Sequence, residues 1–377
     1  MVKKQKYNEK LWAGILLAQF LLFYLLSKSE TAVNVFNTFF EVQKTLHQNI
    51  FSIVGISIGD LFYGLFLLTI IICIYSLFTK SKRKKYCSLL FIVLNIFYFL
   101  YQLFWGMLYF QDSLLTKLPE EDPTLEEAKI LAEKYLNLSL IERRKVRSNK
   151  DGIFKIDQIK EIKQEIISSQ KNLPSPFNQK RVTEIVSIKP SLLSNIMSYS
   201  GILGYYNPFT AEAQYNNQLP ATYLPFTIAH ESAHQLGYAR EQEANFIGFL
   251  IGTSSRNPEI RYSTYLFALK QLLKQINSFD PEFTKTIQNN YSQEMKNDLN
   301  FERKFMIEHR SVLDEILRTT NDAFLKLNQQ EGSITYSYFV DLLIRYERKN
   351  GTFTKQKNRV SQRDSKNTND EKKFITF

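Results

Sequence analysis

Three long apolar stretches dominate the first third of the chain, and short charged segments separate them. No charged residue occurs in Leu11–Ser27, Leu61–Thr79 or Tyr86–Gln111. A helix needs about 20 mostly apolar residues to cross the hydrocarbon core of a bilayer. The pattern therefore predicts three transmembrane helices, at about residues 11–27, 57–79 and 87–110.

The first apolar stretch has an alternative interpretation as a cleavable signal peptide, because a basic head precedes it. Signal peptides end in a small-residue cleavage site. The residues that follow the stretch, Ser27-Lys28-Ser29-Glu30, do not provide one. The stretch is therefore interpreted as a retained anchor, and residues 1–112 as a membrane region.

After the third apolar stretch the pattern is first helical and then alternating. Thr124 and Glu127 have the spacing of a capping box, which predicts a helix to about Leu138. A second amphipathic helix is expected at Ile156–Lys171. Alternation of apolar and polar side chains is typical of strands and occurs in Val182–Ile188 and Ala211–Asn216, whereas Ile196–Tyr206 is rich in β-branched and aromatic residues. These segments are expected to form two or three strands of a small sheet.

From Tyr223 onward the pattern is helical almost to the end of the chain. Further helices are expected at residues 262–279, from Pro281 onward, within 300–327 and at 336–346. Residues 113–350 are thus predicted to form one α+β domain, mostly helical with a small sheet. The tail, residues 351–377, is polar with few apolar side chains, and disorder is expected there.

Basic residues are concentrated on one side of the predicted spans. The segment Lys80–Lys85, between the second and third spans, carries five positive charges, and four lysines precede the first span. The loop of residues 28–54 has only Lys28 and Lys44. Because basic loops stay in the cytoplasm, three spans place the chain after about Gln111 on the outer side of the membrane.

The formal net charge of +11 raises the question of nucleic-acid binding. Nine of the positive charges are the anchors just described, and more lie in the C-terminal tail. The distribution favours a lipid bilayer as partner and no nucleic acid. Cys73 and Cys87, the two cysteines, lie within or beside predicted spans, so the outer domain has neither a disulfide framework nor a Cys-rich zinc site.

The chemistry is concentrated in a His-Glu-x-x-His motif. Two of the four histidines in the chain, His230 and His234, stand four residues apart, which places them on one face of a helix. Both imidazoles can then bind one Zn²⁺. Glu231 lies where its carboxylate reaches a zinc-activated water without binding the metal, so it is the expected general base.

A catalytic zinc usually has three protein ligands and a water. Gly237 is expected to end the first helix in a left-handed turn, and a second helix follows. On it, Glu241 is the expected third ligand, with Glu243 as the alternative, and Asn245 is expected behind the ligands, hydrogen-bonded to a histidine. Arg240 occupies the position where another class of zincins has a third histidine, which argues against that class.

The segment from Ala229 to Phe246 reads AHESAHQLGYAREQEANF. It resembles the gluzincin arrangement, in which His-Glu-x-x-His is followed by Glu-x-x-x-Asp on a second helix. More narrowly, it resembles an uncharacterised family of bacterial multi-pass membrane proteins with a zincin-like outer domain. That resemblance extends over most of the chain, including the apolar spans and the segment Gly204–Phe209.

The resemblance implies a zincin-like metallopeptidase fold and a bacterial inner membrane, in which the outer side of the predicted topology is the periplasmic side. On matching positions it assigns His230, His234 and Glu241 to the metal and Glu231 to catalysis. The chain departs from the broad gluzincin pattern at Asn245, where Asp is usual. An amide accepts a hydrogen bond from imidazole but adds no charge, so a lower metal affinity is expected.

Other candidate site residues have weaker support. Ala211–Asn216 is placed to be an edge strand that binds the substrate backbone, although an ordinary sheet edge is an equal alternative. Glu212 is a candidate site residue, with a solvated strand carboxylate as the preferred interpretation. An oxyanion stabiliser is expected, and its candidates are Tyr205, Tyr206, Arg240, His309 and Tyr336. His47 and Asp60 are interpreted as structural or interfacial residues.

Together these features predict a membrane-anchored zinc peptidase that hydrolyses peptide bonds in peptides or proteins. Two alternatives stay open. One is a catalytically silent zincin-fold membrane protein that binds a partner, although the presence of Glu231 argues against it. The other is a zinc amidase that acts on cell-wall peptides.

Overall fold

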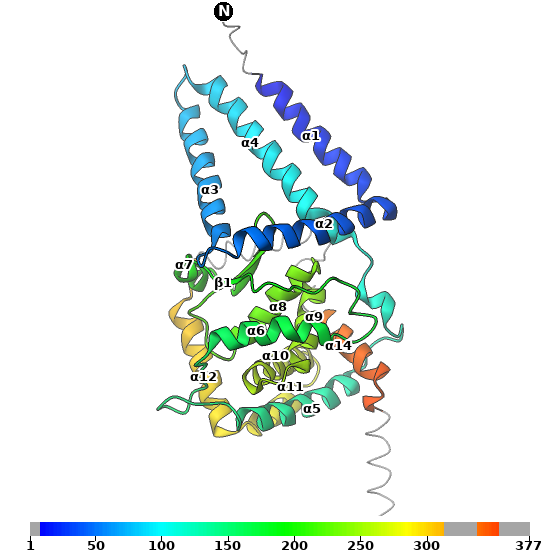
Figure 1. Cartoon of the computed structure of the whole chain (residues 1–377). Helices are drawn as coiled ribbons and strands as arrows, with labels where there is room; N and C mark the ends of the chain where they lie inside the picture. The colour runs from blue at the N-terminus through cyan, green and yellow to red at the C-terminus, as the bar shows by residue number, and fades with distance from the viewer. Residues whose placement is uncertain (1–7, 313–337, 354–377) are drawn as a thin grey trace, which may run out of the picture.

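Three long apolar helices stand together at one end of the molecule, and a mostly helical domain with a small sheet lies at the other (Figure 1). A computed structural model describes residues 8–312 and 338–353. The three helices are α1 (Glu9–Leu26), α3 (Ile58–Leu77) and α4 (Arg83–Phe104). Each is long and apolar enough to cross a membrane, so the described residues contain three candidate spans, the number that the sequence predicts.

The third span ends earlier than expected. Helix α4 stops at Phe104 rather than near residue 110, because the backbone leaves the helical conformation at Trp105 (φ −150°). The chain continues as a short 3-10 helix, η1 (Gly106–Phe110), whose residues are largely buried against the domain. The apolar stretch of residues 86–111 therefore forms both the candidate span α4 and the buried turn η1. Its length alone predicts a span that is too long.

The expected loop over residues 28–54 is largely a helix, α2 (Glu30–Phe51), which crosses below the spans (Figure 1). Phe40 and Lys44 are buried on the side that faces the domain. The Lys44 ammonium group donates to the carbonyl of Arg181 at 2.9 Å and pairs with Glu41. A helix with both a polar and an apolar side lacks the continuous apolar run that reveals a span.

The charged connection between α3 and α4 lies at the end of the spans that is remote from the domain (Figure 1). This connection contains Lys80–Lys85. The end of α1, the start of α3 and the end of α4 all meet α2 and the domain instead. The basic and the weakly charged ends of the spans thus separate as the sequence pattern predicts.

A three-stranded sheet lies between α2 and the helices of the domain (Figure 1). Its strands are β1 (Ile188–Pro190), β2 (Gly204–Asn207) and β3 (Glu212–Tyr215), in the order β1-β3-β2. Strand β3 runs parallel to β1, with Ile188 beside Ala213, and antiparallel to β2. The prediction that residues 211–216 form an edge strand is therefore wrong, because β3 is central and β2 is an edge.

Two other strand predictions are only partly correct. Only Ile188 of the expected strand 182–188 joins the sheet, since Thr183 donates its N–H to the Gln170 side chain at 2.7 Å rather than to a neighbouring strand. The expected strand 196–206 begins as the short helix α7 (Ser194–Tyr199) and becomes extended only at β2.

The helical part of the domain is close to prediction. The capping box of Thr124 and Glu127 is present at the start of α5, and Pro281 opens α11. The expected helices at 300–327 and 336–346 and the tail lie partly or wholly outside the described residues. The described helices of the domain are η2 (Leu114–Lys117), α5 (Leu125–Arg143), α6 (Ile159–Ser169), η3 (Gln170–Asn172), α8 (Leu224–Leu236), α9 (Glu241–Ser254), α10 (Pro258–Ile276), α11 (Pro281–Asn289), α12 (Gln293–Glu308) and α14 (Tyr338–Lys349).

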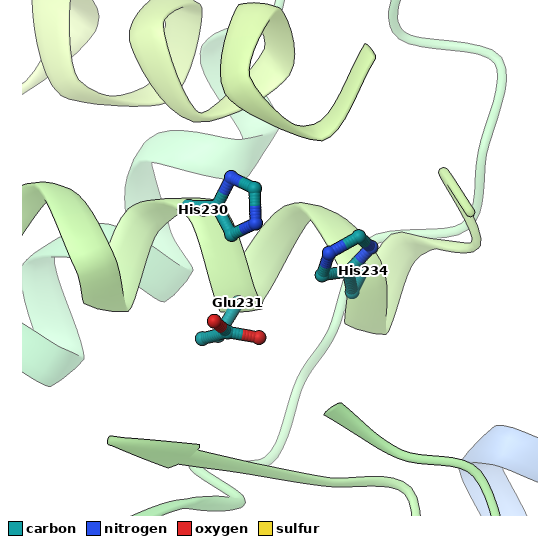
Figure 2. A group of neighbouring side chains, drawn as sticks. All are labelled: His230, Glu231 and His234. Carbon is teal, nitrogen blue, oxygen red and sulfur yellow. The ribbon is translucent and has the colours of Figure 1, made fainter. Parts of the chain in front are cut away.

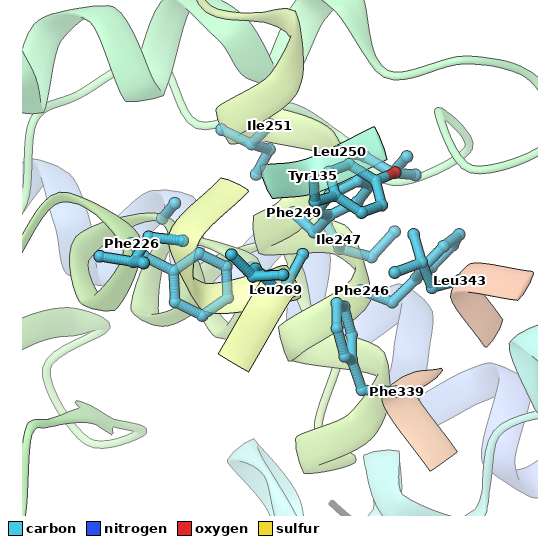
Figure 3. Close-up of a cluster of buried hydrophobic side chains, with 14 of the residues drawn as sticks. Tyr135, Phe226, Phe246, Ile247, Phe249, Leu250, Ile251, Leu269, Phe339 and Leu343 are labelled. Atoms are coloured by element: carbon cyan, nitrogen blue, oxygen red, sulfur yellow. The ribbon is translucent and has the colours of Figure 1, made fainter. Parts of the chain in front are cut away.

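The core of the domain is built around α9, which is buried along most of its length. Helices α5, α8, α10 and α14 surround it (Figure 3). Phe249 of α9 packs edge-on against Tyr135 of α5 with ring centroids 5.6 Å apart, and against Phe339 of α14. Apolar packing on several sides fixes α9 in place, and with it the residues at its N-terminus.

Candidate metal centre

The two helices of the motif are joined by a sharp turn at Gly237. Helix α8 ends there because Gly237 adopts a left-handed conformation (φ 100°), as the sequence predicts. Its N–H donates to the carbonyl of His234 at 2.8 Å. A Cβ at this position would also lie 2.8 Å from the Phe40 ring. Four residues later α9 begins with Glu241, which the turn directs back toward α8.

Close packing between the two helices brings their polar groups together. A Cβ added to Gly248 of α9 would lie 3.0 Å from the backbone N and Cα of His230. The glycine therefore lets α9 approach α8 more closely than any other residue would allow. About two turns of helix before this contact, at the start of α9, Glu241 reaches the motif histidines.

His230, Glu231 and His234 project from one helix, with Glu231 turned toward the sheet (Figure 2). Their potential ligand atoms all lie within 4.8 Å of one another. The ring centroids of the two histidines are 4.7 Å apart, and the rings are nearly perpendicular. The spacing of four residues thus produces the convergence that metal binding requires.

Glu241 lies opposite both histidines. One carboxylate oxygen is 3.3 Å from Nε2 of His230, and the other is 3.6 Å from Nε2 of His234. Glu243 points elsewhere: its Oε1 accepts hydrogen bonds from the N–H of Leu114 at 2.9 Å and from Arg240 at 3.0 Å. Of the two glutamates considered as third ligand, the structure brings only Glu241 to the histidines.

These separations fit a zinc ion. Zinc binds imidazole nitrogen and carboxylate oxygen at about 2.0–2.2 Å in tetrahedral geometry, which separates neighbouring ligand atoms by about 3.3–3.5 Å. The distances from Glu241 to the histidine nitrogens, 3.3 Å from Oε2 to His230 and 3.6 Å from Oε1 to His234, are each close to that spacing. A His-His-Glu donor set is one of the known catalytic zinc sets.

The groups behind the histidines differ from expectation. His234 directs Nδ1 at the carbonyl of Tyr238, 2.7 Å away, which orients the ring and leaves Nε2 for the metal. Asn245 is buried, but among the described residues it makes no hydrogen bond to either histidine. Nδ1 of His230 is buried and likewise has no partner in the described part of the chain. Of the two histidines, only His234 therefore has a hydrogen-bond partner for Nδ1 among the described residues.

Glu231 is buried beside the edge strand β2. Its side chain is buried, and in the described ranges its Oε2 has no hydrogen-bond partner. Burial raises the pKa of Glu231 to about 7, against the opposing effect of the two histidines, while Glu241 adds to the rise. A carboxyl group with a pKa near neutral is suited to accept and return a proton.

The histidine and Glu241 side chains form an ion pair in the metal-free protein. Burial alone would lower the pKa of His234, but the contact with Glu241 outweighs it and raises the pKa to about 9. Burial also works against ionisation of Glu241, yet the two histidines hold its pKa well below its ordinary value. At neutral pH the Glu241 carboxylate thus faces the protonated His234 ring. A metal cation that binds here replaces the proton of that ring.

The oxyanion candidates are mostly engaged elsewhere. The Tyr205 hydroxyl donates to Asp60, Arg240 contacts Glu243, and the His309 ring packs on Phe305. Tyr336 lies outside the described residues. The ring of Tyr206 packs on Trp105, and its buried hydroxyl has no partner in the described chain.

Glu212 has neither of the roles that the sequence suggested for it. It is fully buried and forms an ion pair with Lys189. Its Oε2 also accepts the N–H of Gly59 at 2.6 Å, at the start of α3. Glu212 therefore joins the sheet to a membrane helix, and the prediction of a solvated carboxylate is wrong.

Two neighbours of the site lie far from the motif in sequence, and the spacing within the motif predicts neither of them. The ring of Trp105 lies edge-on to His234, with centroids 5.7 Å apart. Gly204 lies against Glu231, and a Cβ there would be 2.6 Å from Oε1. Neither contact can be predicted from the residues next to the motif, because both depend on how distant segments of the chain pack.

Searches against curated proteins and against solved structures found no match. A family model described as "Protein of unknown function (DUF3810)" matches residues 36–344. The match begins within α2 and runs to α14, so it includes α3, α4, the sheet and both helices of the candidate metal centre. This chain therefore belongs to the DUF3810 family.

Proposed function

We propose that this protein is a membrane-anchored zinc peptidase with a zincin-like domain. The observation that carries the proposal is the position of Glu241, whose carboxylate faces Nε2 of both His230 and His234. Glu231 lies in the same group, buried and without a competing partner in the described chain. A purely structural site has no use for that fourth side chain.

The four residues have two different roles, metal binding and proton transfer. His230, His234 and Glu241 would hold the ion, and zinc in such a site lowers the pKa of a bound water and polarises a carbonyl group. Glu231 takes the proton of the attacking water and delivers it to the leaving amine. In the metal-free protein, burial raises the pKa of Glu231 to about 7, and burial of this carboxylate favours a role in proton transfer.

Within residues 8–312 and 338–353, β2 pairs with a strand on one side only, which is β3, and its other side is the proposed binding site for the substrate backbone. The N–H of Asn216 donates to the carbonyl of Leu203 at 2.8 Å. Because hydrogen-bonded pairs alternate along antiparallel strands, the backbone groups of Gly204 and Tyr206 point away from β3. An extended peptide can pair with them and pass directly beside Glu231.

The charge pattern supports an outer location for the domain. The basic connection at Lys80–Lys85 lies at the end of the spans that is remote from the domain. If that connection is cytoplasmic, as the positive-inside rule predicts, an odd number of spans places the metal centre on the outer side.

The decisive experiment compares zinc content and hydrolysis in the same preparations. Full-length protein is loaded with zinc in detergent and incubated with a randomised peptide library, and the products are identified by mass spectrometry. We expect one zinc per chain and cleavage by the wild type. Glu231→Gln should retain the zinc and lose cleavage, whereas His230→Ala should lose both.

Two results would contradict the proposal. One is a wild-type protein that contains no zinc after loading. The other is cleavage by Glu231→Gln at the wild-type rate, because that cleavage cannot depend on the proposed general base.

A further inference from the structure

The metal centre lies directly below the end of a membrane span. Trp105 is the residue that follows α4, and its ring contacts both Tyr206, at a centroid distance of 4.6 Å, and His234, at 5.7 Å. Helix α4 has 22 residues, so it is about 33 Å long and matches a hydrocarbon core of about 30 Å. Only the Trp105 side chain thus lies between the end of α4 and His234, a proposed metal ligand.

The sheet is held firmly against the spans. The turn between β2 and β3 inserts Phe209 between α3 and α4, where its ring lies 4.6 Å from that of Phe62 and 5.0 Å from that of Phe97. Gln43 of α2 donates to the carbonyl of Pro208 at 3.2 Å. The position of β2 relative to the membrane helices is therefore fixed by packing.

Helix α2 presents an apolar stripe on the side of the spans. The stripe is exposed and repeats at helical spacing, and it consists of Val35, Phe39, Val42, Leu46 and Ile50. Within it, the Phe39 ring stacks on Phe104, the last residue of α4, with centroids 6.2 Å apart. The opposite side of α2 is buried against the domain. A helix with this arrangement lies in the plane of a membrane interface.

A second group of exposed apolar side chains, the α7 edge, lies on α7 and on the segments before and after it, and ends just before β2. It consists of Leu192, Leu193, Ile196, Ile202 and Leu203. The N–H of Leu192 donates to Asp60, in the first turn of α3, at 2.7 Å. This edge therefore lies at the base of a span, and contiguous apolar surface of this kind marks a contact with a membrane or partner.

We infer that the α2 stripe and the α7 edge lie in the lipid interface, so that the metal centre opens at the bilayer surface and acts on polypeptides anchored in the same membrane. The substrate part of this inference rests on the proposed peptidase function. The apolar edge ends at Leu203, and Gly204 beside it lies against Glu231. A polypeptide that leaves the bilayer along this edge reaches the free side of β2 at once, so the bond beside Glu231 is close to the membrane.

The position of the two apolar surfaces is testable without any catalysis. In a background of Cys73→Ala and Cys87→Ala, which removes both cysteines, nitroxide labels are attached at Leu46→Cys, at Ile196→Cys and, as control, at the exposed Gln288→Cys of α11. In vesicles, the first two labels should collide more often with oxygen than with a water-soluble nickel complex, and the control should show the reverse. If Leu46 and Ile196 behave like Gln288, the inference is overturned.

The substrate class is tested with one peptide library presented in three forms. The library is attached to a membrane anchor through about 5 residues, attached through about 30 residues, or left free; at about 3.5 Å per residue, only the short linker confines the peptide to the surface. Full-length protein in vesicles should cleave the short-linker form at least tenfold faster than the free form, with Glu231→Gln inactive.

The outcomes separate the two proposals. Equal cleavage of all three forms, or faster cleavage of the free peptide, overturns the inference and leaves the peptidase function standing. Cleavage of no form by the wild type, or equal cleavage by Glu231→Gln, overturns the peptidase function and the proposed substrate class with it. The label positions are read independently of either result.

Discussion

Gly204 of β2 lies against the side chain of Glu231: a Cβ added at Gly204 would be 2.6 Å from Oε1 and 2.8 Å from Cγ of the glutamate. The edge strand and the proposed general base therefore occupy adjoining space. Because Gly204 has no side chain, the carboxylate can lie beside the free edge of the strand, where the substrate backbone is proposed to pair.

Replacing Gly204 by alanine should impair hydrolysis and spare metal binding. The new methyl group must displace Glu231 or shift β2, because it would also lie 2.8 Å from the Gln214 carbonyl. A displacement of about 1 Å at a catalytic group costs about a hundredfold in rate. We expect Gly204→Ala to lower kcat by about that factor, measured on any peptide that the wild type cleaves, with zinc content unchanged.

Gly55→Ala is the matched control, because no atom lies within 4 Å of a Cβ at that position. It should cleave at the wild-type rate. Loss of zinc in Gly204→Ala would show that the strand supports the ligands rather than the general base, and would contradict the assignment of Glu231 to this contact.

The sequence predicts the site better than its surroundings. The spacing of His230 and His234 and the turn at Gly237 are local features, and helical periodicity converts them directly into geometry. Glu241 was preferred over Glu243 by its face on a helix, which is again local. Trp105 and Gly204 contact the site because the spans and the sheet pack against α8. The spacing of residues along the chain does not predict contacts of this kind.

The same division explains the fold. Long apolar runs and capping signals located α1, α3, α4 and α5, since each depends on neighbouring residues. Strand order does not: β3 was assigned to the edge, but it pairs with β1 on one side and β2 on the other. Alternation indicates an extended segment without saying which segments lie on either side of it.

Removing the charge of Glu241 should weaken zinc binding. Its carboxylate faces both histidines, whereas Glu243 faces Arg240 and Leu114. Outer partners of a metal site contribute about 10–100-fold to affinity, and a direct ligand should contribute more. We expect Glu241→Gln to lower zinc affinity by more than about 100-fold, measured by competition with a fluorescent chelator.

Glu243→Gln is the control for that measurement, because the amide oxygen still accepts from the N–H of Leu114 while the metal site is untouched. Its zinc affinity should equal that of the wild type. If Glu243→Gln loses zinc and Glu241→Gln keeps it, the third ligand has been assigned to the wrong residue.

Zinc binding should release a proton from His234 over a defined pH range. The pKa of His234 in the metal-free protein is raised from 6.5 to about 9 through Glu241, so the imidazole is protonated at neutral pH and must lose its proton to bind metal. The ion pair stabilises the metal-free protein below about pH 6.5 and is lost as the pH rises through about 9. Zinc affinity should therefore rise about tenfold per pH unit between these values.

Calorimetric titration of zinc in buffers of different ionisation enthalpy measures this release. At pH 7.5 it should report about one proton per zinc from this group. Removal of the charge in Glu241→Gln takes away the cause of the raised pKa, so the release at this pH should fall. An affinity for zinc that is constant from pH 6.5 to 9 would rule out a protonated His234.

Lys189 and Glu212 form a buried ion pair that connects the sheet with the membrane region, and this pair gives the last prediction. The ammonium group also donates to the carbonyls of Phe51 at 2.7 Å and Ile56 at 2.9 Å, while Glu212 accepts the N–H of Gly59. Glu212→Gln keeps the shape and leaves the buried ammonium uncompensated, which typically costs about 3–5 kcal/mol. We expect the free energy of unfolding in detergent, followed by circular dichroism in urea, to fall by that amount, at the lower end because two carbonyls remain. Asp157→Asn, which breaks an exposed pair with Arg147, should leave the midpoint nearly unchanged; equal effects of the two variants would mean that Glu212 does not hold the domain to α3.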